Sequence, residues 1–154
     1  MKTRKWTRVI LIIIAIFLLA SFALSLALGL GRNPPVIQEV TWDSPQTREL
    51  AQKACFDCHS NETKWPIYSY IPPFSLFIAR HVQEGREKLN FSEWLPGRNQ
   101  EDGEEAIDSI REGEMPLPSY LPMHSEARLN PQEKEVLAQG LLATLGSGQG
   151  GEGH

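Results

Sequence analysis

A run of 22 residues without a charge, from Val9 to Leu30, restricts the fold of this chain more than any other feature. As a helix with a rise of about 1.5 Å per residue, the run is roughly 33 Å long, enough to cross a hydrocarbon core of about 30 Å. Residues 1–8 hold four basic side chains, and only Arg32 follows the run closely. Because basic residues collect on the cytoplasmic side of a span, we expect the N-terminus in the cytoplasm and the residues after 31 outside it.

Retention of this run as an anchor competes with its removal as a signal peptide, because Ser25-Leu26-Ala27 is an acceptable cleavage site. The run is longer than the apolar core of a usual signal peptide, which favours the anchor. The rest of the chain is exported in either case. We predict a cytoplasmic stub, an anchor, a linker, one small domain and a disordered Gly-rich tail, at residues 1–8, 9–30, 31–43, 44–145 and 146–154 respectively.

The chain beyond residue 31 is acidic. It holds all 19 acidic residues but only 11 of the 15 basic ones, which gives it a formal charge of −8. Nucleic acid repels a surface of this sign, so we expect no nucleic-acid partner.

Local signals predict an all-α domain of about four short helices with long loops. Ser44 followed by Pro45 is an N-cap and first-turn pair, which opens a helix leading into Cys55. Apolar periodicity and capping residues predict three further helices, at residues 74–89, 102–112 and 130–145. No segment alternates as a strand would. A domain so small and so rich in loops usually needs a disulfide, a metal or a cofactor to hold it together.

The two cysteines of the chain lie in Cys55-Phe56-Asp57-Cys58-His59, which has the Cys-x-x-Cys-His pattern of c-type haem attachment. Two thiols three residues apart on a helical turn can form thioethers with the two vinyl groups of one porphyrin. The adjacent His59 is then held beneath the iron as its proximal ligand. The pattern therefore predicts one covalent haem c.

Three other sites can use the same residues. A disulfide between Cys55 and Cys58 would close a very small loop and stabilise little. A zinc site would need a fourth ligand beside these cysteines and His59 or His81, and the chain has no second close-spaced pair. A dithiol oxidoreductase would need a β-α-β setting around the motif. Predicted export places the motif where haem c is attached, which favours haem.

The motif continues into several segments that read together as one pattern: 55–66 (CFDCHSNETKWP), 84–86 (EGR), 89–94 (LNFSEW), 113–116 (GEMP) and 119–120 (SY). Over roughly residues 48–142 the chain closely resembles the bacterial haem-binding domain family of small exported cytochrome c-like proteins. The resemblance implies a haem c domain with attachment at Cys55, Cys58 and His59, and we expect a class I cytochrome c-like fold. Ile67 stands where the family pattern would have a second aromatic residue.

Met115 is the expected distal iron ligand. It follows a helix that Gly113 can end, and Pro116 favours an extended backbone that leaves the thioether free to reach inward. A Met-Pro pair presents this ligand in many small cytochromes c, so the resemblance points to the same residue. A gap-filling core methionine is the structural alternative. The other candidate ligands are His124, which would give a bis-histidine iron of lower potential, Met123 and His81.

Other side chains have both a haem-related and an ordinary role. Five aromatic residues can line the haem pocket or fill a core: Trp65, Tyr68, Tyr70, Phe74 and Trp94. Two arginines can pair with the haem propionates or lie in solvent: Arg80 and Arg86.

These features together predict a monohaem c-type cytochrome, anchored by one N-terminal span in the cytoplasmic membrane with its haem domain on the periplasmic or extracytoplasmic side. We expect a one-electron carrier that serves redox partner proteins and is not itself an enzyme. A haem-based sensor or ligand-binding module, with an open or displaceable sixth iron ligand, is the alternative. Membership of a larger respiratory or dehydrogenase complex is compatible with the carrier.

Overall fold

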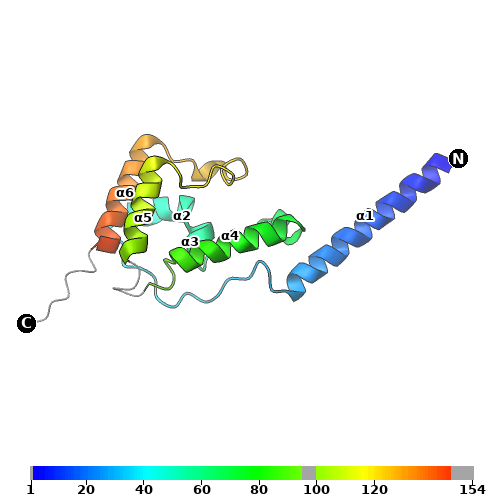
Figure 1. The fold of residues 1–154 in the computed structure, drawn as a ribbon, viewed down its shortest axis with the longest axis horizontal. Helices are drawn as coiled ribbons and strands as arrows, with labels where there is room; N and C mark the ends of the chain where they lie inside the picture. The colour runs from blue at the N-terminus through cyan, green and yellow to red at the C-terminus, as the bar shows by residue number, and fades with distance from the viewer. Residues whose placement is uncertain (1, 95–99, 147–154) are drawn as a thin grey trace, which may run out of the picture. The chain divides into compact units, whose positions relative to one another are not determined.

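The computed structural model describes residues 2–94 and 100–146, and the chain divides into two compact units. The first unit comprises residues 1–33 and 64–81, and the second comprises residues 34–63 and 82–154. The described residues form helices and no strands, with one isolated bridge between Gln38 and Glu93 (Figure 1). The predicted all-α class with a long apolar helix at the N-terminus is confirmed.

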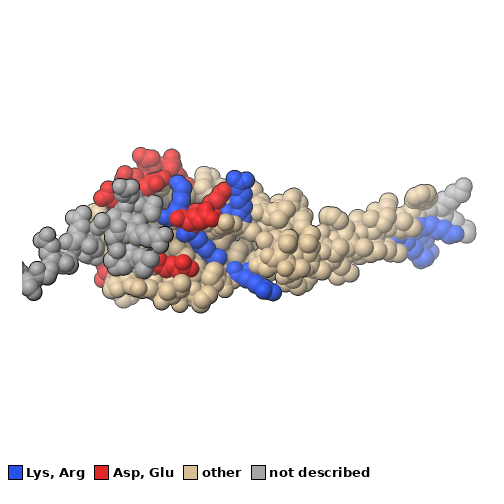
Figure 2. All heavy atoms as spheres, turned by 60° about the horizontal axis from the view of Figure 1, so that its bottom comes forward, with Lys and Arg blue, Asp and Glu red and all other residues tan. Residues whose placement is uncertain are grey.

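The first unit contains α1 (Lys2–Ala27), the short 3₁₀ helix η1 (Ile67–Tyr70) and the start of α4 (Phe74–Lys88). By length and composition, residues 4–27 are able to cross a membrane, although a signal sequence would meet the same criteria. On the face shown in Figure 2, basic side chains lie at the N-terminal end of α1 and the rest of its surface carries no charge. The helix ends at Ala27, three residues before the predicted end of the span at Leu30. Gly29 and Gly31, which follow the helix, adopt positive φ angles of 69° and 77°.

The second unit contains α2 (Pro45–Ala54), α3 (Phe56–His59), the end of α4, α5 (Gln100–Glu112), the 3₁₀ helix η2 (Ser125–Ala127) and α6 (Pro131–Gly146). The predicted helix starts have local causes. The Ser44 hydroxyl accepts a hydrogen bond from the Thr47 amide at 3.2 Å and so caps α2. Asn130 and Glu133 exchange side-chain to backbone hydrogen bonds of 2.8 and 2.9 Å, a capping box for α6.

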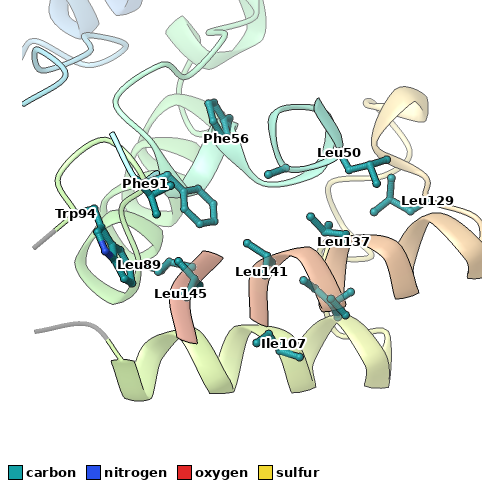
Figure 3. Packing of buried hydrophobic residues seen from close by; sticks show 14 residues of the cluster. Leu50, Phe56, Leu89, Phe91, Trp94, Ile107, Leu129, Leu137, Leu141 and Leu145 are labelled. Carbon is teal, nitrogen blue, oxygen red and sulfur yellow. The ribbon is translucent and has the colours of Figure 1, made fainter. Parts of the chain in front are cut away.

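The core of the second unit lies between α2, α5, α6 and the segment that follows α4 (Figure 3). Its buried side chains include Leu50, Phe56, Leu89, Phe91, Trp94, Ile107, Leu137, Leu141 and Leu145. Gly140 brings α6 against α2, because a Cβ at this position would collide with the Thr47 side chain. Lys53 on α2 also pairs with Glu133 on α6 at 3.0 Å. The C-terminal helix thus packs across the helix that leads into the cysteine motif.

Part of the segment predicted as a linker belongs to this fold. Val40 is buried in the core, and its amide donates a hydrogen bond to the carbonyl of Phe91 at 3.0 Å. The amide of Trp94 donates to the carbonyl of Gln38 at 2.9 Å. The folded second unit therefore begins before residue 44.

Candidate functional site

The cysteine motif forms a single helical turn at the end of α2. The Cys55 amide donates to the carbonyl of Ala51 at 2.7 Å, and the amides of Cys58 and His59 both donate to the Cys55 carbonyl, at 3.1 and 2.9 Å. Residues three apart on such a turn lie on one face, so Cys55 and Cys58 are neighbours. Both side chains are half-buried free thiols. The motif thus brings the two thiols and His59 together on one helical turn.

Both thiols are protonated at neutral pH. Burial raises the pKa of the Cys55 thiol to about 12, and burial together with the nearby charge of Asp57 raises that of Cys58 to about 11. A dithiol oxidoreductase depends on a cysteine with a lowered pKa. These surroundings disfavour that activity.

The His59 ring is oriented by two backbone carbonyls at the end of α4. Its Nδ1 atom lies 3.0 Å from the carbonyl oxygen of Gly85 and 3.1 Å from that of Leu89. Carbonyls only accept, so Nδ1 carries the hydrogen and Nε2 keeps its lone pair. Burial lowers the pKa of His59, so the ring is neutral at pH 7. Metal-binding histidines are typically held in this way, by a hydrogen bond from the nitrogen that does not bind the metal.

Gly85 allows α4 to approach the motif closely enough to orient His59. A Cβ at this position would lie 2.6 Å from the carbonyl oxygen of Cys58 and 3.1 Å from its Cβ. Both the motif turn and α4 would have to shift, because the nearest atom belongs to the backbone. This contact explains the glycine in the segment 84–86.

We expect Gly85→Ala to destabilise the haem-loaded chain by about 1–3 kcal/mol, the usual cost of inserting a methyl group into a closely packed site. In an open helix position the same change would stabilise by up to about 1 kcal/mol. Urea unfolding of the full chain in detergent, followed by haem absorption, measures the difference.

Gly103→Ala on α5 is the matched control, because its added Cβ would meet the Leu145 side chain at 3.1 Å, and a side chain can move where a backbone cannot. We expect this control to change stability by less than about 1 kcal/mol. Equal effects of the two substitutions would contradict the role given to Gly85.

Arg86 fixes the loop that follows His59. Its Nε atom donates to the Ser60 carbonyl at 2.8 Å, and its Nη2 atom donates to the Thr63 hydroxyl at 2.9 Å. The Thr63 hydroxyl in turn donates to the carbonyl of Asp57, inside the motif, at 2.8 Å. Arg86 is therefore engaged with the loop, and the solvated position that was one alternative for it is wrong.

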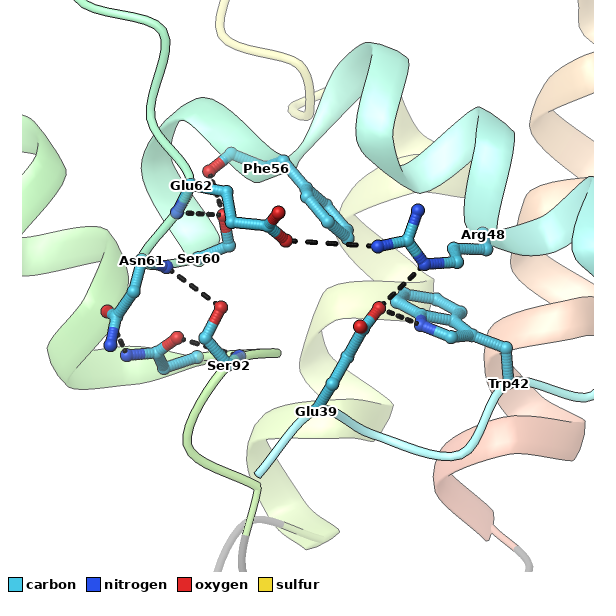
Figure 4. A network of polar contacts seen from close by, with 9 residues as sticks. Glu39, Trp42, Arg48, Phe56, Ser60, Asn61, Glu62 and Ser92 are labelled. Carbon is cyan, nitrogen blue, oxygen red and sulfur yellow. Dashed lines mark hydrogen bonds and ion pairs between the residues drawn. The ribbon is translucent and has the colours of Figure 1, made fainter. Parts of the chain in front are cut away.

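Asn61 joins this loop to the segment 89–94 (Figure 4). The Asn61 backbone amide donates to the Ser92 hydroxyl at 3.0 Å, and its side-chain Nδ2 atom donates to a Glu93 carboxylate oxygen at 2.7 Å. Its Oδ1 atom accepts from Asn90 at 3.0 Å. Asn61, Asn90 and Ser92 are buried, so the hydrogen bonds among these three residues are protected from water, whereas the bond to Glu93 is partly exposed. Residues 89–94 thus hold the loop that follows the cysteine motif in place.

A second polar group on the same side involves the segment before α2 (Figure 4). Glu39 accepts hydrogen bonds from Trp42 Nε1 at 2.8 Å and from Arg48 Nε at 2.7 Å. Arg48 also lies 3.8 Å from Glu62 and stacks over the Phe56 ring at 5.5 Å. Glu62 follows the motif and Phe56 lies within it, so this group also holds the motif in place.

Tyr120 and His124 lie against the motif through Asp57. The Tyr120 hydroxyl donates to Asp57 Oδ2 at 2.6 Å, and its ring stacks on the His124 ring with centroids 3.9 Å apart. Nδ1 of His124 lies 4.0 Å from the same Asp57 oxygen and 3.3 Å from Glu126. Burial and the Asp57 hydrogen bond raise the pKa of Tyr120, so it remains a donor at neutral pH. This contact gives the segment 119–120 a structural role.

The candidate distal ligands occupy different surroundings. Met115 is half-buried and packs against the core, after Gly113 has ended α5 with a φ of 80°. Its amide donates to the Ser109 carbonyl at 3.1 Å. Met123 is exposed, and Nδ1 of His81 lies 2.9 Å from the Phe77 carbonyl oxygen of its own helix.

The five aromatic residues predicted to line a haem pocket or a core are divided between the two units. Trp94 is part of the core of the second unit, whereas the others belong to the first unit with Arg80: Trp65, Tyr68, Tyr70 and Phe74. Sequence reasoning missed the roles of Gly85, Asn61 and Trp42. Gly85 and Asn61 lie within the segments that carry the family resemblance, but those segments do not by themselves identify a contact partner.

The family model for the haem-binding domain matches residues 17–143, which is most of the chain. The chain therefore belongs to the haem-binding domain family, and haem is its cofactor. Comparison with curated proteins and with solved structures found no match.

The residues of the motif fit a haem. Two neighbouring thiols and a neutral histidine with a free Nε2 form the required donor set. Within residues 2–94 and 100–146, no three or more His, Cys, Asp or Glu side chains are grouped so that they could hold a metal ion. The zinc site weighed from the sequence therefore has no support in the described part of the chain.

Proposed function

We propose that this protein is a membrane-anchored monohaem c-type cytochrome, a one-electron carrier on the extracytoplasmic face and not itself an enzyme. One observation carries the proposal: the two thiols of Cys55 and Cys58 share a helical turn with a histidine whose Nδ1 is bound to backbone carbonyls. This combination provides two points of covalent attachment and one nitrogen ligand. The family match supports haem as the group that it receives.

Each residue has a separate role in holding the haem. The thiols of Cys55 and Cys58 would add across the two vinyl groups, each sulfur bonding to one vinyl carbon and its hydrogen passing to the other. His59 would ligate iron through Nε2, and Met115 would supply the distal thioether. A haem held in this way supplies one iron that takes up and releases one electron.

The hydrogen bonds around the motif suit an electron carrier. Arg86, Asn61 and the carbonyls of Gly85 and Leu89 hold the His59 segment from several directions, which limits its movement when the charge of the site changes.

The N-terminal helix supports attachment to the cytoplasmic membrane. Residues 4–27 are able to span it by length and composition, and the basic residues before the span favour a cytoplasmic N-terminus. The haem domain would then lie on the extracytoplasmic side, where redox proteins of the same compartment are its partners.

Potentiometric titration of the full chain, made with a haem c maturation system and purified in detergent, tests the carrier function. We expect a single one-electron transition and an absorption and magnetic circular dichroism spectrum of a six-coordinate haem c in both states. Carbon monoxide should leave the spectrum of the reduced protein nearly unchanged, because both axial positions are filled. Ready binding of carbon monoxide by the unaltered chain would instead establish the sensor or ligand-binding module.

A further inference from the structure

Residues 64–81 carry an apolar surface that the fold of the first unit does not cover. Four large side chains are strongly exposed: Ile67 at 84%, Phe74 at 58%, Leu76 at 57% and Phe77 at 56%. The segment contains no acidic residue, and its basic residues, Lys64 and Arg80, stand at its two ends. An apolar surface with charge only at its margins is typical of a segment that contacts another apolar phase.

The same segment is bound to the last turns of α1. Among the side chains described on α1 from Arg4 onward, only Ser21 and Ser25 are buried, and they lie one turn apart on one face. The Ser25 hydroxyl donates to the Tyr70 carbonyl at 3.0 Å, and the rings of Phe22 and Tyr70 meet edge to face with centroids 5.8 Å apart. Small residues on a membrane helix allow this kind of close approach.

These contacts fix the depth of the segment. Ser25 lies two residues before the end of α1, about 3 Å along the helix axis, so Tyr70 is held at the C-terminal end of the span. Trp65, Tyr68 and Tyr70 add three amphipathic rings at this level, where such rings are enriched in membrane proteins. Nε1 of Trp65 donates to the Asn33 side chain at 2.9 Å, just after the end of the span.

We propose that residues 64–81 are a second, non-spanning membrane contact, with Ile67, Phe74, Leu76 and Phe77 inserted into the outer leaflet of the lipid bilayer. The inference rests on the proposed anchoring of α1, because the bound end of that helix sets the level of the segment. The contacts of Tyr70 with Ser25 and Phe22 hold this apolar surface at the end of the span, where lipid is the apolar phase beside it. We therefore favour lipid as the molecule that covers the surface.

Spin labels in the full haem-loaded chain, reconstituted into phosphatidylcholine and phosphatidylglycerol nanodiscs, test this inference. Ile67→Cys and Leu76→Cys place a nitroxide in the segment, and power saturation compares collisions with oxygen, which concentrates in lipid, and with a water-soluble nickel chelate. We expect the oxygen-to-nickel ratio at both positions to exceed, several-fold, the ratio at Gln139→Cys, an exposed site on α6. The signal of the wild-type chain is subtracted, and its size separately reports whether Cys55 and Cys58 are blocked by haem.

Leu19→Cys on α1 separates the two proposals, since it reports anchoring alone. A lipid environment at residue 19 with water at 67 and 76 would overturn the inference and leave the anchor intact. Water at residue 19 would overturn the anchoring and the inference together. Poor access of both oxygen and the nickel chelate to residues 67 and 76 would overturn the proposed lipid contact and indicate that a protein covers this surface.

Discussion

The double change Cys55→Ser with Cys58→Ser is expected to remove all covalently bound haem from the chain. These are the two cysteines of the sequence, and a serine hydroxyl does not form the thioether that resists denaturation. The full chain, made with a haem c maturation system, should give a band stained for haem peroxidase activity on a denaturing gel. The double variant should give an equal amount of protein and no stain.

A control substitution near the motif and the two single cysteine variants test whether the loss of stain is specific to the two thiols. Gln52→Ser lies on the exposed side of α2, one turn before the motif, and should stain as strongly as the unaltered chain. Each single cysteine change leaves one thioether and should weaken the stain without removing it. A stained band that survived the double change would exclude thioether attachment at this motif.

The starts of α2 and α6 were predictable because their causes lie within a few residues. The Ser44 hydroxyl accepts a hydrogen bond from the Thr47 amide, and Asn130 and Glu133 each accept one from the other's backbone amide. Both caps join residues three apart, so sequence spacing alone identifies them. Gly113 was identifiable as the end of α5 for the same reason, since an αL position favours glycine. The start of α5 at Gln100 lies two residues before the predicted position.

Features that depend on distant parts of the chain were not predictable in this way. Gly85 matters because it faces Cys58, and no local pattern places α4 against the motif. On α6, Val136 is exposed whereas Ala138 and Gly140 are buried, a pattern that apolar periodicity does not indicate. Helix α6 packs against both α2 and α5, so it buries a broader face than a single stripe describes.

The candidate site shows the same division. The chemistry of Cys55, Cys58 and His59 follows from their spacing, because all of it is contained in one turn. The residues that orient His59 come from positions 26 and 30 residues later, and only the folded chain shows which carbonyls they contribute. A pattern can therefore identify the ligand, and the structure is needed to identify what fixes its tautomer.

Changing Met115 is expected to have the largest effect on the electronic properties of the haem, because a thioether ligand favours reduced iron. In Met115→Ala the reduction potential should fall by on the order of 0.1 V, within the range that axial ligands control. The weak sulfur-to-iron charge-transfer band of the ferric protein, at the red end of the visible spectrum, should disappear. The reduced variant should also bind carbon monoxide, because its distal position is open.

Two further variants separate ligation from packing. Met115 packs against the core, so Met115→Leu preserves most of the buried volume and removes the sulfur alone. This variant should lose the same band and show the same fall in potential as Met115→Ala while remaining folded. His124→Ala should leave both properties nearly unchanged, because the His124 Nδ1 atom faces the carboxylates of Asp57 and Glu126. Retention of the band in both Met115 variants, with its loss in His124→Ala, would transfer the distal position to His124.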